Sequence, residues 1–523
     1  MPVPLPRSRS SGPAIVLGLA VAKLAFHLLT ANRYGIFRDE LYYLACSEHL
    51  DWGYVDQPPL IGLVTWLVRN VLGESLMALR LLPAIAGAAL VWLTGKLTRD
   101  MGGGPFAQSL AALAVLVAPV FLLMSHWLTM NAFEPLIWLG CVWCVVRVIN
   151  HGQSRYWFWF GVLAGIGMQT KYTVAFLILG VIVGLLVTPQ RRELRSGWIW
   201  LGALVAFLIF LPNLVWLIRH DFPFLELMSN IRASGRDVAR NPLAFIVDQA
   251  MLMNPILFPL WVAGIAWLLF SRDGSRYRLL AWAYLTMLVM FIALKGKNYY
   301  LAPAYPMLLA SGAIAFSKIT RVTSDADSPS VRFTGRFWLR TACIVLVLIA
   351  GFVFAPLTAP ILPVETFIRY QKALGIEPPK AEHQDTGPLP QYFADEFGWE
   401  DMTREVARVF NSLTPEERSR TAIFANSYGQ AGAIDFFGPR YGLPKSISNH
   451  QNYWYWGPRN YEGDIVIVLG SDGRGDREHF RSVEAVGRTF HPYSRRDEHF
   501  DIFLCRGLTS KLSDVWPTMK NWR

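Results

Sequence analysis

The sequence predicts a mainly α-helical, polytopic membrane protein of about eleven transmembrane helices, followed by a small α/β domain outside the membrane. Of its 523 residues, 53% are apolar and 17% are charged, whereas a soluble protein of this size carries about 25% charged residues. The apolar residues form long blocks up to about Pro356, after which the composition becomes that of a soluble domain. We therefore expect a membrane domain over 1–358 and an extracytoplasmic domain over 359–523.

Ten apolar blocks predict eleven transmembrane helices, since about 20 apolar residues cross a bilayer. One long block, 156–189, is expected to hold two shorter helices that are broken near Lys171. The other nine lie near 14–31, 76–96, 105–124, 130–149, 197–217, 254–271, 277–294, 299–317 and 338–357. The apolar run 58–72 is shorter and predicts a helix lying at the membrane surface.

The basic residues predict the orientation of the chain. If Arg7 and Arg9 are cytoplasmic, every alternate short loop places its basic residues on the same side, as the positive-inside rule expects. These loops carry Lys96, Arg99, Arg147, Arg155, Arg191, Arg192, Arg195, Arg272, Arg276, Arg278, Lys318, Arg321, Arg332, Arg336 and Arg340. An odd number of spans then leaves the C-terminal domain outside. The net charge of +11 therefore indicates contact with membrane lipids, and no motif indicates nucleic acid.

The remaining bulk features predict local structure rather than function. Strands are expected at 421–425, 464–469 and 500–504, and an amphipathic helix at 404–413. The five cysteines show no disulfide framework, and Cys141 and Cys144 match only half of a zinc site. The first apolar block lacks a small-residue cleavage site, which predicts a retained first helix rather than a signal peptide.

The strongest chemical signal is the segment 37–43, where Asp39 and Glu40 follow directly after the first predicted span. A carboxylate held near the membrane surface suits a base that takes a proton from an acceptor hydroxyl or amine. A solvated turn containing an Arg–Asp pair explains the residues equally well. The aromatic and proline-rich segment 51–60 offers a face for stacking on a sugar, although a simple interfacial anchor is the favoured explanation.

Several short motifs, collinear along nearly the whole chain, resemble a known family. The sequence reads Asp-Glu-Leu-Tyr-Tyr at 39–43, Asp-Gln-Pro-Pro-Leu at 56–60 and Ala-Leu-Arg-Leu-Leu-Pro at 78–83. It continues with Thr-Lys-Tyr-Thr at 170–173 and Lys-Asn-Tyr-Tyr-Leu-Ala-Pro at 297–303, and the tail segments 425–433 and 453–458 add further matches. This order resembles the polyprenyl-phosphate-dependent transferases of the protein mannosyltransferase and aminoarabinose transferase superfamily, which are C-type glycosyltransferases.

The resemblance implies an inverting enzyme of the bacterial inner membrane, with a cytoplasmic N-terminus and a periplasmic C-terminal domain. Its donor would be one sugar on a polyprenyl monophosphate, and its acceptor a glycolipid, a glycan or a protein. The first exterior loop, 32–75, would be catalytic, with Asp39 as the base and Glu40 as its partner. The expected substrate-binding residues are Tyr42, Tyr43, Asp56, Gln57, Glu134, Tyr172, Tyr299 and Tyr300.

Cations near the outer boundary are candidates for binding the donor phosphate, whose negative charge must be stabilised as it leaves. The candidates are Arg80, Lys171 and Lys297, with Arg219 and His220 as weaker ones. For each lone cation, snorkelling to the interface is the more frequent role. Lys171 and Lys297 stand out because each lies beside tyrosines in a motif of the family type.

Two features leave alternatives open. Relatives often have an acidic residue near the position of Asn131, whereas here Glu134 lies about one helical turn deeper. No cofactor is required, but binding of a divalent metal ion is left open. Its ligands could come from Asp39, Glu40, His49 and Asp56, although their spacing in the sequence does not itself indicate a metal site. Lys23 and His27 share one face of the first span, where packing or snorkelling is favoured over a phosphate-binding role.

Two other functions compete with sugar transfer. A lipid or sugar transporter, or a flippase, often shows repeated halves around a midplane site, but this chain has no evident repeat and its polar motifs gather at one face. A membrane-anchored scaffold would leave the Asp39–Glu40 pair without a purpose. The sequence therefore favours an enzyme.

Overall fold

The computed structural model describes residues 11–235, 240–320, 335–376, 385 and 387–523, and the chain divides into two compact units. Unit 1 comprises 1–31, 79–211 and 239–362, and unit 2 comprises 32–78, 212–238 and 363–523. The expected division at 358/359 thus differs from the observed grouping, because the segment 32–78 groups with the C-terminal residues. The basic residues Arg7, Arg9, Arg321 and Arg332 lie outside the described residues.

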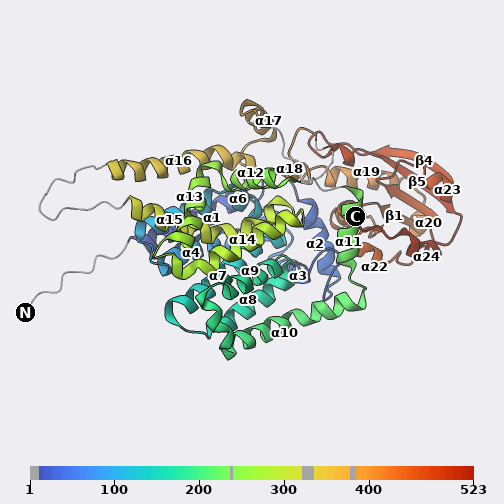
Figure 1. Cartoon of the computed structure of the whole chain (residues 1–523). Helices are drawn as coiled ribbons and strands as arrows, with labels where there is room; N and C mark the ends of the chain where they lie inside the picture. The colour runs from blue at the N-terminus through green and yellow to red at the C-terminus, as the bar shows by residue number, and fades with distance from the viewer. Residues whose placement is uncertain (1–10, 236–239, 321–334, 377–384, 386) are drawn as a thin grey trace, which may run out of the picture. The chain divides into compact units, whose positions relative to one another are not determined.

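Unit 1 is built from helices (Figure 1). They are α1 (Gly12–Thr30), α4 (Leu76–Asp100), α5 (Pro105–Val117), α6 (Pro119–Met124), α7 (Met130–His151), α8 (Tyr156–Thr170), α9 (Val174–Leu186), α10 (Gly197–Arg219), α12 (Pro242–Met253), α13 (Phe258–Phe270), α14 (Arg278–Ala293), α15 (Tyr305–Ile319) and α16 (Gly335–Thr358), with the 3₁₀ turns η1 (Pro189–Arg195), η2 (Pro255–Leu257), η3 (Ser275–Tyr277) and η4 (Asn298–Ala304). The first residues of α4 and the last residues of α10 belong to unit 2.

All eleven predicted spans are helical, but they differ in their capacity to cross a membrane. Within the described residues, seven helices are long and apolar enough, or nine if the two sharply bent pairs are each counted as one span. The bent pairs are α9 with η1 and α12 with the helix at 255–270. The two predicted spans outside this count are α5, with 13 residues, and α8, with 15. The break near Lys171 ends α8 early, as the sequence predicts.

Glycines allow helices of unit 1 to approach each other closely. A Cβ atom on Gly312 of α15 would lie 1.9 Å from the backbone oxygen of Leu260, and one on Gly264 of α13 would lie 2.2 Å from that of Leu308. The backbones of α13 and α15 are therefore in direct contact, as is common where lipid gives apolar helices no hydrophobic reason to associate. Substituting either glycine would force the two helices apart.

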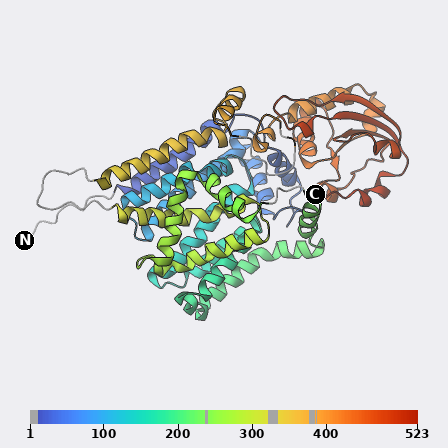
Figure 2. The same ribbon diagram turned by 45° about the horizontal axis from the view of Figure 1, so that its top comes forward.

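Unit 2 contains short helices and one five-stranded sheet (Figure 2). The helices are α2 (Arg38–Glu48), α3 (Leu60–Leu72), α11 (Pro223–Ser234), α17 (Val364–Ala373), α18 (Gln391–Ala394), α19 (Trp399–Asn411), α20 (Pro415–Arg420), α21 (Tyr428–Phe437), α22 (Asn452–Trp456), α23 (Asp476–His479) and α24 (Leu512–Val515), with the 3₁₀ turns η5 (Gly438–Tyr441), η6 (Arg496–Glu498) and η7 (Trp516–Met519). The helix α3 corresponds to the predicted surface helix, and α19 to the predicted amphipathic helix.

The strands β1 (Thr421–Ala425), β2 (Ile447–Ser448), β3 (Ile465–Leu469), β4 (Phe480–Arg488) and β5 (Asp501–Leu508) are arranged in the order β2-β1-β3-β5-β4. The first three are parallel, and β5 runs antiparallel to both β3 and β4. Every residue of β1 and β3 is buried, as expected for strands covered on both faces. The three predicted strands are confirmed, whereas the exposed edge strand β4 lacks an apolar run and was not predicted.

Candidate active site

The segment predicted as a catalytic loop begins an α-helix. The side chain of Glu40 accepts a hydrogen bond from the backbone N–H of Phe37 at 3.0 Å, which caps the first turn of α2. Glu40 is only 1% exposed, so its carboxylate faces the protein. The adjacent Asp39 is 29% exposed at its side chain. The two carboxylates of the pair therefore lie in different environments.

The carboxylate of Asp39 is held by two neighbours in unit 2. The hydroxyl of Tyr428 donates to Oδ1 at 2.8 Å, and Nε of Arg38 lies 3.6 Å from the same oxygen. Burial raises the pKa of Tyr428 well above its ordinary value, against the opposing charge of Arg38 and together with that of Asp39. Tyr428 therefore stays protonated at neutral pH and remains a donor. Both contacts use Oδ1, and within the described residues Oδ2 has no hydrogen bond.

A chain of buried charges fixes the start of α2. The backbone N–H of Arg38 donates to the backbone oxygen of Asp395 at 3.0 Å, and its guanidinium lies 3.8 Å from the Asp395 carboxylate. Arg495 pairs with that carboxylate at 2.9 Å and with Glu498 at 2.7 Å. Because alternating charges compensate one another, Arg38 is positioned beside Asp39 without carrying an unbalanced buried charge.

Tyr42 and Asp56, two of the predicted substrate-binding residues, contact each other. The Tyr42 hydroxyl donates to Asp56 at 3.1 Å and accepts a bond from the backbone N–H of Asn452 at 3.3 Å. Asn452 in turn accepts the backbone N–H of Val55 at 2.6 Å. Burial, and then the nearby Asp56, raises the pKa of Tyr42 well above its ordinary value. These hydrogen bonds connect α2, the segment that follows it and α22 to one another.

The other two predicted residues of this segment are enclosed. Tyr43 is 3% exposed and Gln57 is fully buried. The amide nitrogen of Gln57 lies 3.9 Å from the Cys46 sulfur.

All five cysteines are free, consistent with the expectation of no disulfide framework.

Unit 1 holds a second polar cluster, around Lys171 at the end of α8. Its ammonium donates to Asn131 at 2.7 Å and to Glu134 at 3.0 Å, and Thr173 donates to the other oxygen of Glu134. The same ammonium lies 4.5 Å from the ring centre of Tyr300 and 5.3 Å from that of Tyr299. Glu134 thus supplies the acidic partner that the sequence lacks at position 131.

Arg80 belongs to a third group, also in unit 1. It is 1% exposed, donates to the backbone oxygen of Ala31 at 2.8 Å and lies 3.2 Å from Nε2 of His126. Lys23 is equally buried, and its ammonium donates to the backbone oxygens of Phe121 and Leu116 at 3.0 and 3.4 Å. Lys23 therefore satisfies carbonyls at the break between α5 and α6, as the favoured packing role predicts, and does not snorkel.

The remaining candidates are placed as follows. Lys297 is the residue immediately before η4, where Tyr299 and Tyr300 lie, and Tyr172 follows Lys171 directly. His220 stacks on Trp216 with ring centres 4.1 Å apart, and Arg219 is exposed at the end of α10. Within the described residues, no three His, Cys, Asp or Glu side chains gather as a metal site would require.

Tyr428, the main partner of Asp39, was not assigned a role from the sequence. It lies in the segment 425–433, which carries part of the family resemblance, but 389 residues separate it from Asp39. Its ring lies 4.7 Å from that of Tyr42 and stacks on His450 at 5.2 Å. Asp395 and Arg495 were missed for the same reason, since nothing local in the sequence indicates which distant chain segment covers α2.

The long apolar helices make the chain a multi-pass membrane protein, and its fold is that of the C-type glycosyltransferases. The family model described as dolichyl-phosphate-mannose-protein mannosyltransferase matches residues 56–216. The structure of ArnT from Cupriavidus metallidurans bound to undecaprenyl phosphate is similar over 95% of this chain and 98% of that one, with a TM-score of 0.60 and 14% identity.

Two relatives from Rhizobium johnstonii are similar in sequence. The lipid A galacturonosyltransferase RgtD is 26% identical over 56% of this chain and 62% of its own length. The lipopolysaccharide core galacturonosyltransferase RgtB is 24% identical over 42% and 45%. Both matches span less than two thirds of the relative. The resemblance found in the motifs is confirmed by these matches.

Proposed function

We propose that this protein transfers one sugar from a polyprenyl-phosphate carrier to an extracytoplasmic glycolipid, with inversion at the anomeric carbon. The observation that carries the proposal is the state of Asp39, a partly exposed carboxylate at the start of α2 with one oxygen held by Tyr428. The proposed orientation places α2 and the C-terminal domain on the periplasmic side of the bacterial inner membrane.

In this mechanism Asp39 is the general base. Its free oxygen Oδ2 takes the proton of an acceptor hydroxyl while that hydroxyl attacks the anomeric carbon, and the bond from that carbon to the carrier phosphate breaks. Tyr428 orients the carboxylate by binding Oδ1, and Arg38 keeps a compensating charge beside it. Glu40 contributes by capping α2, which fixes the position of Asp39. General-base catalysis of this kind contributes about 10²- to 10⁴-fold to the rate.

The departing phosphate requires cations, and we assign this role to Lys171 and Lys297. The Lys171 ammonium already has two oxygen partners and two tyrosine rings around it, so its position is fixed before a phosphate arrives. Glu134 lowers the net charge of this cluster, and we infer that Lys297 supplies the additional positive charge. Arg80 already contacts Ala31 and His126, so we assign it the role of stabilising the C-terminal end of α1.

The relatives guide the choice of substrates. ArnT is described as bound to undecaprenyl phosphate, which supports a polyprenyl-phosphate donor here. The two galacturonosyltransferases are described as acting on lipid A and on the lipopolysaccharide core, which supports a glycolipid as the acceptor. A divalent ion stays a prediction, and its candidate ligands Glu40 and Asp56 already have other partners.

The test replaces Asp39 in cells that lack the native gene. Cells carrying Asp39→Asn should accumulate the polyprenyl-phosphate sugar and lose one sugar from their membrane glycolipids, both measured by mass spectrometry. The matched control is Glu74→Gln, an exposed carboxylate after α3 in the same unit, which should behave as the wild type.

Two results would contradict the proposal. Normal glycolipids in Asp39→Asn cells would remove Asp39 from its role. Loss of a transported substrate with no change in any glycolipid would favour the transporter instead.

A further inference from the structure

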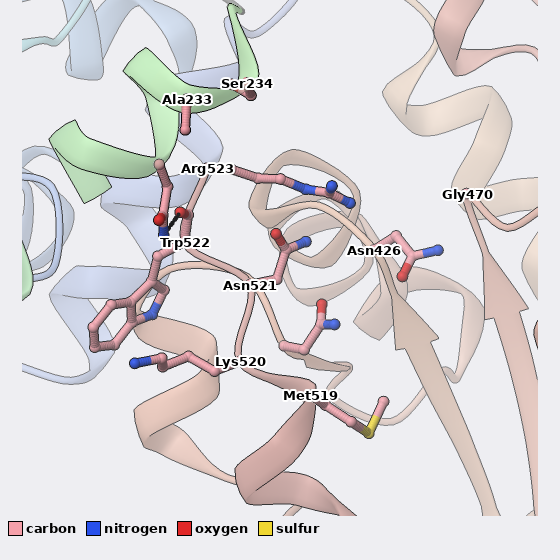
Figure 3. Close-up of a pocket in the computed structure, with 11 residues that line it drawn as sticks. Ala233, Ser234, Asn426, Gly470, Met519, Lys520, Asn521, Trp522 and Arg523 are labelled. Carbon is pink, nitrogen blue, oxygen red and sulfur yellow. Dashed lines mark hydrogen bonds between the residues drawn. The ribbon is translucent and has the colours of Figure 1, made fainter. Parts of the chain in front are cut away.

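Unit 2 contains a pocket of about 640 Å³ whose lining residues were given no role above (Figure 3). This volume is in the range of small-molecule sites. One wall comes from α11, another from the ends of strands, and the third from the final residues 519–523. The lining residues are Asn230, Ala233, Ser234, Asn426, Asn449, Gly470, Met519, Lys520, Asn521, Trp522 and Arg523.

The pocket lies at the carboxyl ends of the parallel strands. Asn426 directly follows β1, Asn449 directly follows β2, and Gly470 directly follows β3. The chain leaves β1 for its neighbour β2 on one side and then crosses to β3 on the other side. Ligands of open α/β sheets bind at this kind of switch point, where loops from adjacent strands separate and leave a crevice.

The polar groups that line the pocket are mainly neutral amides. Four asparagines contribute, and Figure 3 shows Asn426, Asn521 and Arg523 among the lining residues. The Oδ1 atom of Asn449 is buried and accepts no hydrogen bond within the described part of the chain, which is uncommon for such a group. A rotation of this amide offers both its donor and its acceptor. Amides that donate and accept side by side match the neighbouring hydroxyls of a sugar.

The pocket has a positive group in the guanidinium of Arg523, whose main-chain oxygen is held by His450. The other cation, Lys520, forms an ion pair with Glu226 at 2.7 Å, so its charge is compensated. The guanidinium of Arg523 has no ion-pair partner among the residues that the structure describes. A guanidinium binds carboxylate or phosphate oxygens through two parallel hydrogen bonds. The pocket therefore suits a ligand that combines hydroxyl groups with one anionic group.

Direct contacts join the pocket to Asp39. The Tyr428 hydroxyl binds Asp39, and the Tyr428 ring stacks on His450. Nδ1 of His450 accepts the backbone N–H of Tyr428 at 3.1 Å, so its proton is on Nε2, which donates to the backbone oxygen of Arg523 at 3.0 Å. Two side chains thus separate the proposed base from the pocket wall.

We propose that this pocket binds an acidic saccharide, a sugar unit bearing a carboxylate or a phosphate. If the proposed function holds, this unit belongs to the acceptor. Arg523 binds the anionic group, while Asn426, Asn449 and Asn521 bind hydroxyls. The pocket then holds one unit of the acceptor while Asp39 deprotonates a hydroxyl on another.

The test measures binding of three matched sugars to the purified full-length protein by NMR saturation transfer. The probes are glucose, glucuronic acid and glucose 6-phosphate, which share a ring and differ only in their anionic group. We expect the acidic sugars to bind about tenfold more tightly than glucose, since hydrogen bonds to charged groups are worth more than neutral ones. The tighter of the two identifies carboxylate or phosphate as the preferred group.

Variants assign the binding to the pocket. Arg523→Ala should remove the preference for acidic sugars, and Asn449→Ala should weaken all three sugars at least threefold. The control Arg404→Ala, an exposed arginine of α19, should change neither. If no sugar binds, or if both pocket variants bind as the wild type does, the inference is overturned.

A second readout separates this inference from the proposed function. Arg523→Ala should raise KM for the acceptor about tenfold, whereas Asp39→Asn should leave sugar binding unchanged. Sugar binding without any transfer activity in the wild type would overturn the function and retain the pocket. Transfer activity without sugar binding would overturn the inference about the pocket and retain the proposed function.

Discussion

The polar clusters around Lys171 and Asp39 differ in how closely their charged groups are paired. In unit 1 the Lys171 ammonium is 10% exposed at its side chain, is paired with Glu134 at 3.0 Å and is enclosed by tyrosine rings. In unit 2 the Asp39 carboxylate is 29% exposed and is held mainly by a neutral tyrosine. The first cluster pairs its charges at 3.0 Å, whereas the Asp39 carboxylate has its cation at 3.6 Å and, within the described residues, one oxygen without a hydrogen bond. A group that must take a proton requires the second arrangement.

The largest effect should follow from breaking the enclosed pair. Lys171→Met leaves Glu134 buried without its cation, which should lower the free energy of unfolding by about 3–5 kcal/mol. The double variant Lys171→Met/Glu134→Gln should recover most of that loss, because neither charge then remains. Thermal unfolding of the full-length protein in detergent measures both. A single variant as stable as the wild type would contradict the comparison.

A smaller effect, on the rate of transfer, should follow from removing the hydrogen bond that Tyr428 donates to Asp39 while the Asp39 carboxylate is kept. Tyr428→Phe removes only the hydroxyl that binds Oδ1, so the rate of transfer should fall about tenfold, in line with one hydrogen bond to a charged group. The control is Tyr441→Phe, which removes a comparable 2.9 Å bond to Glu400 in the same unit. Steady-state kinetics should show a loss for the first variant alone, and equal losses in both would indicate a general structural effect.

The smallest effect concerns pH. Burial opposes ionisation of Glu48, but Lys445 and Arg69 outweigh it and hold the pKa of this carboxyl below its ordinary value of 4.5. Since the pKa is lower in the folded state, the stabilisation is complete above about pH 4.5 and is lost as the pH falls through the folded-state pKa.

Unfolding curves at pH 7 and pH 3.5 test this. Glu48→Gln should be less stable than the wild type at pH 7 by about 1 kcal/mol or less, and the difference should shrink at pH 3.5. Glu484→Gln, an exposed carboxylate of β4, should show no such change. A difference that grows as the pH falls would contradict the assignment.

The sequence predicts those parts of the fold that depend on local composition. Apolar blocks locate the helices, and runs of apolar residues locate β1, β3 and β5, because burial acts on each segment independently of its partners. It does not predict α2 as a helix, since the segment is polar and is stabilised by a cap from Glu40 and by the distant Asp395. The exposed edge strand β4 shows no apolar run and was missed for that reason.

The candidate site follows the same division. Asp39, Lys171 and Glu134 could be chosen from short motifs, because an ionisable group at the membrane level is conspicuous in the sequence. Their partners could not, because Tyr428 is brought to Asp39, and Thr173 to Glu134, only by the tertiary fold. The different states of Asp39 and Glu40 illustrate this most clearly. The sequence presents them as an adjacent pair, and the helix turns one toward solvent and the other inward.

The central claim is that Asp39 acts on the proton of the acceptor and does not bind the donor. The most direct measurement compares purified wild-type protein with Asp39→Asn, determining kcat for transfer and the dissociation constant of the polyprenyl-phosphate sugar in parallel. We predict that kcat falls by about 10²- to 10⁴-fold while donor binding changes by less than about threefold, a difference under 1 kcal/mol. An unchanged kcat, or a loss of transfer fully explained by weaker donor binding, would contradict the account.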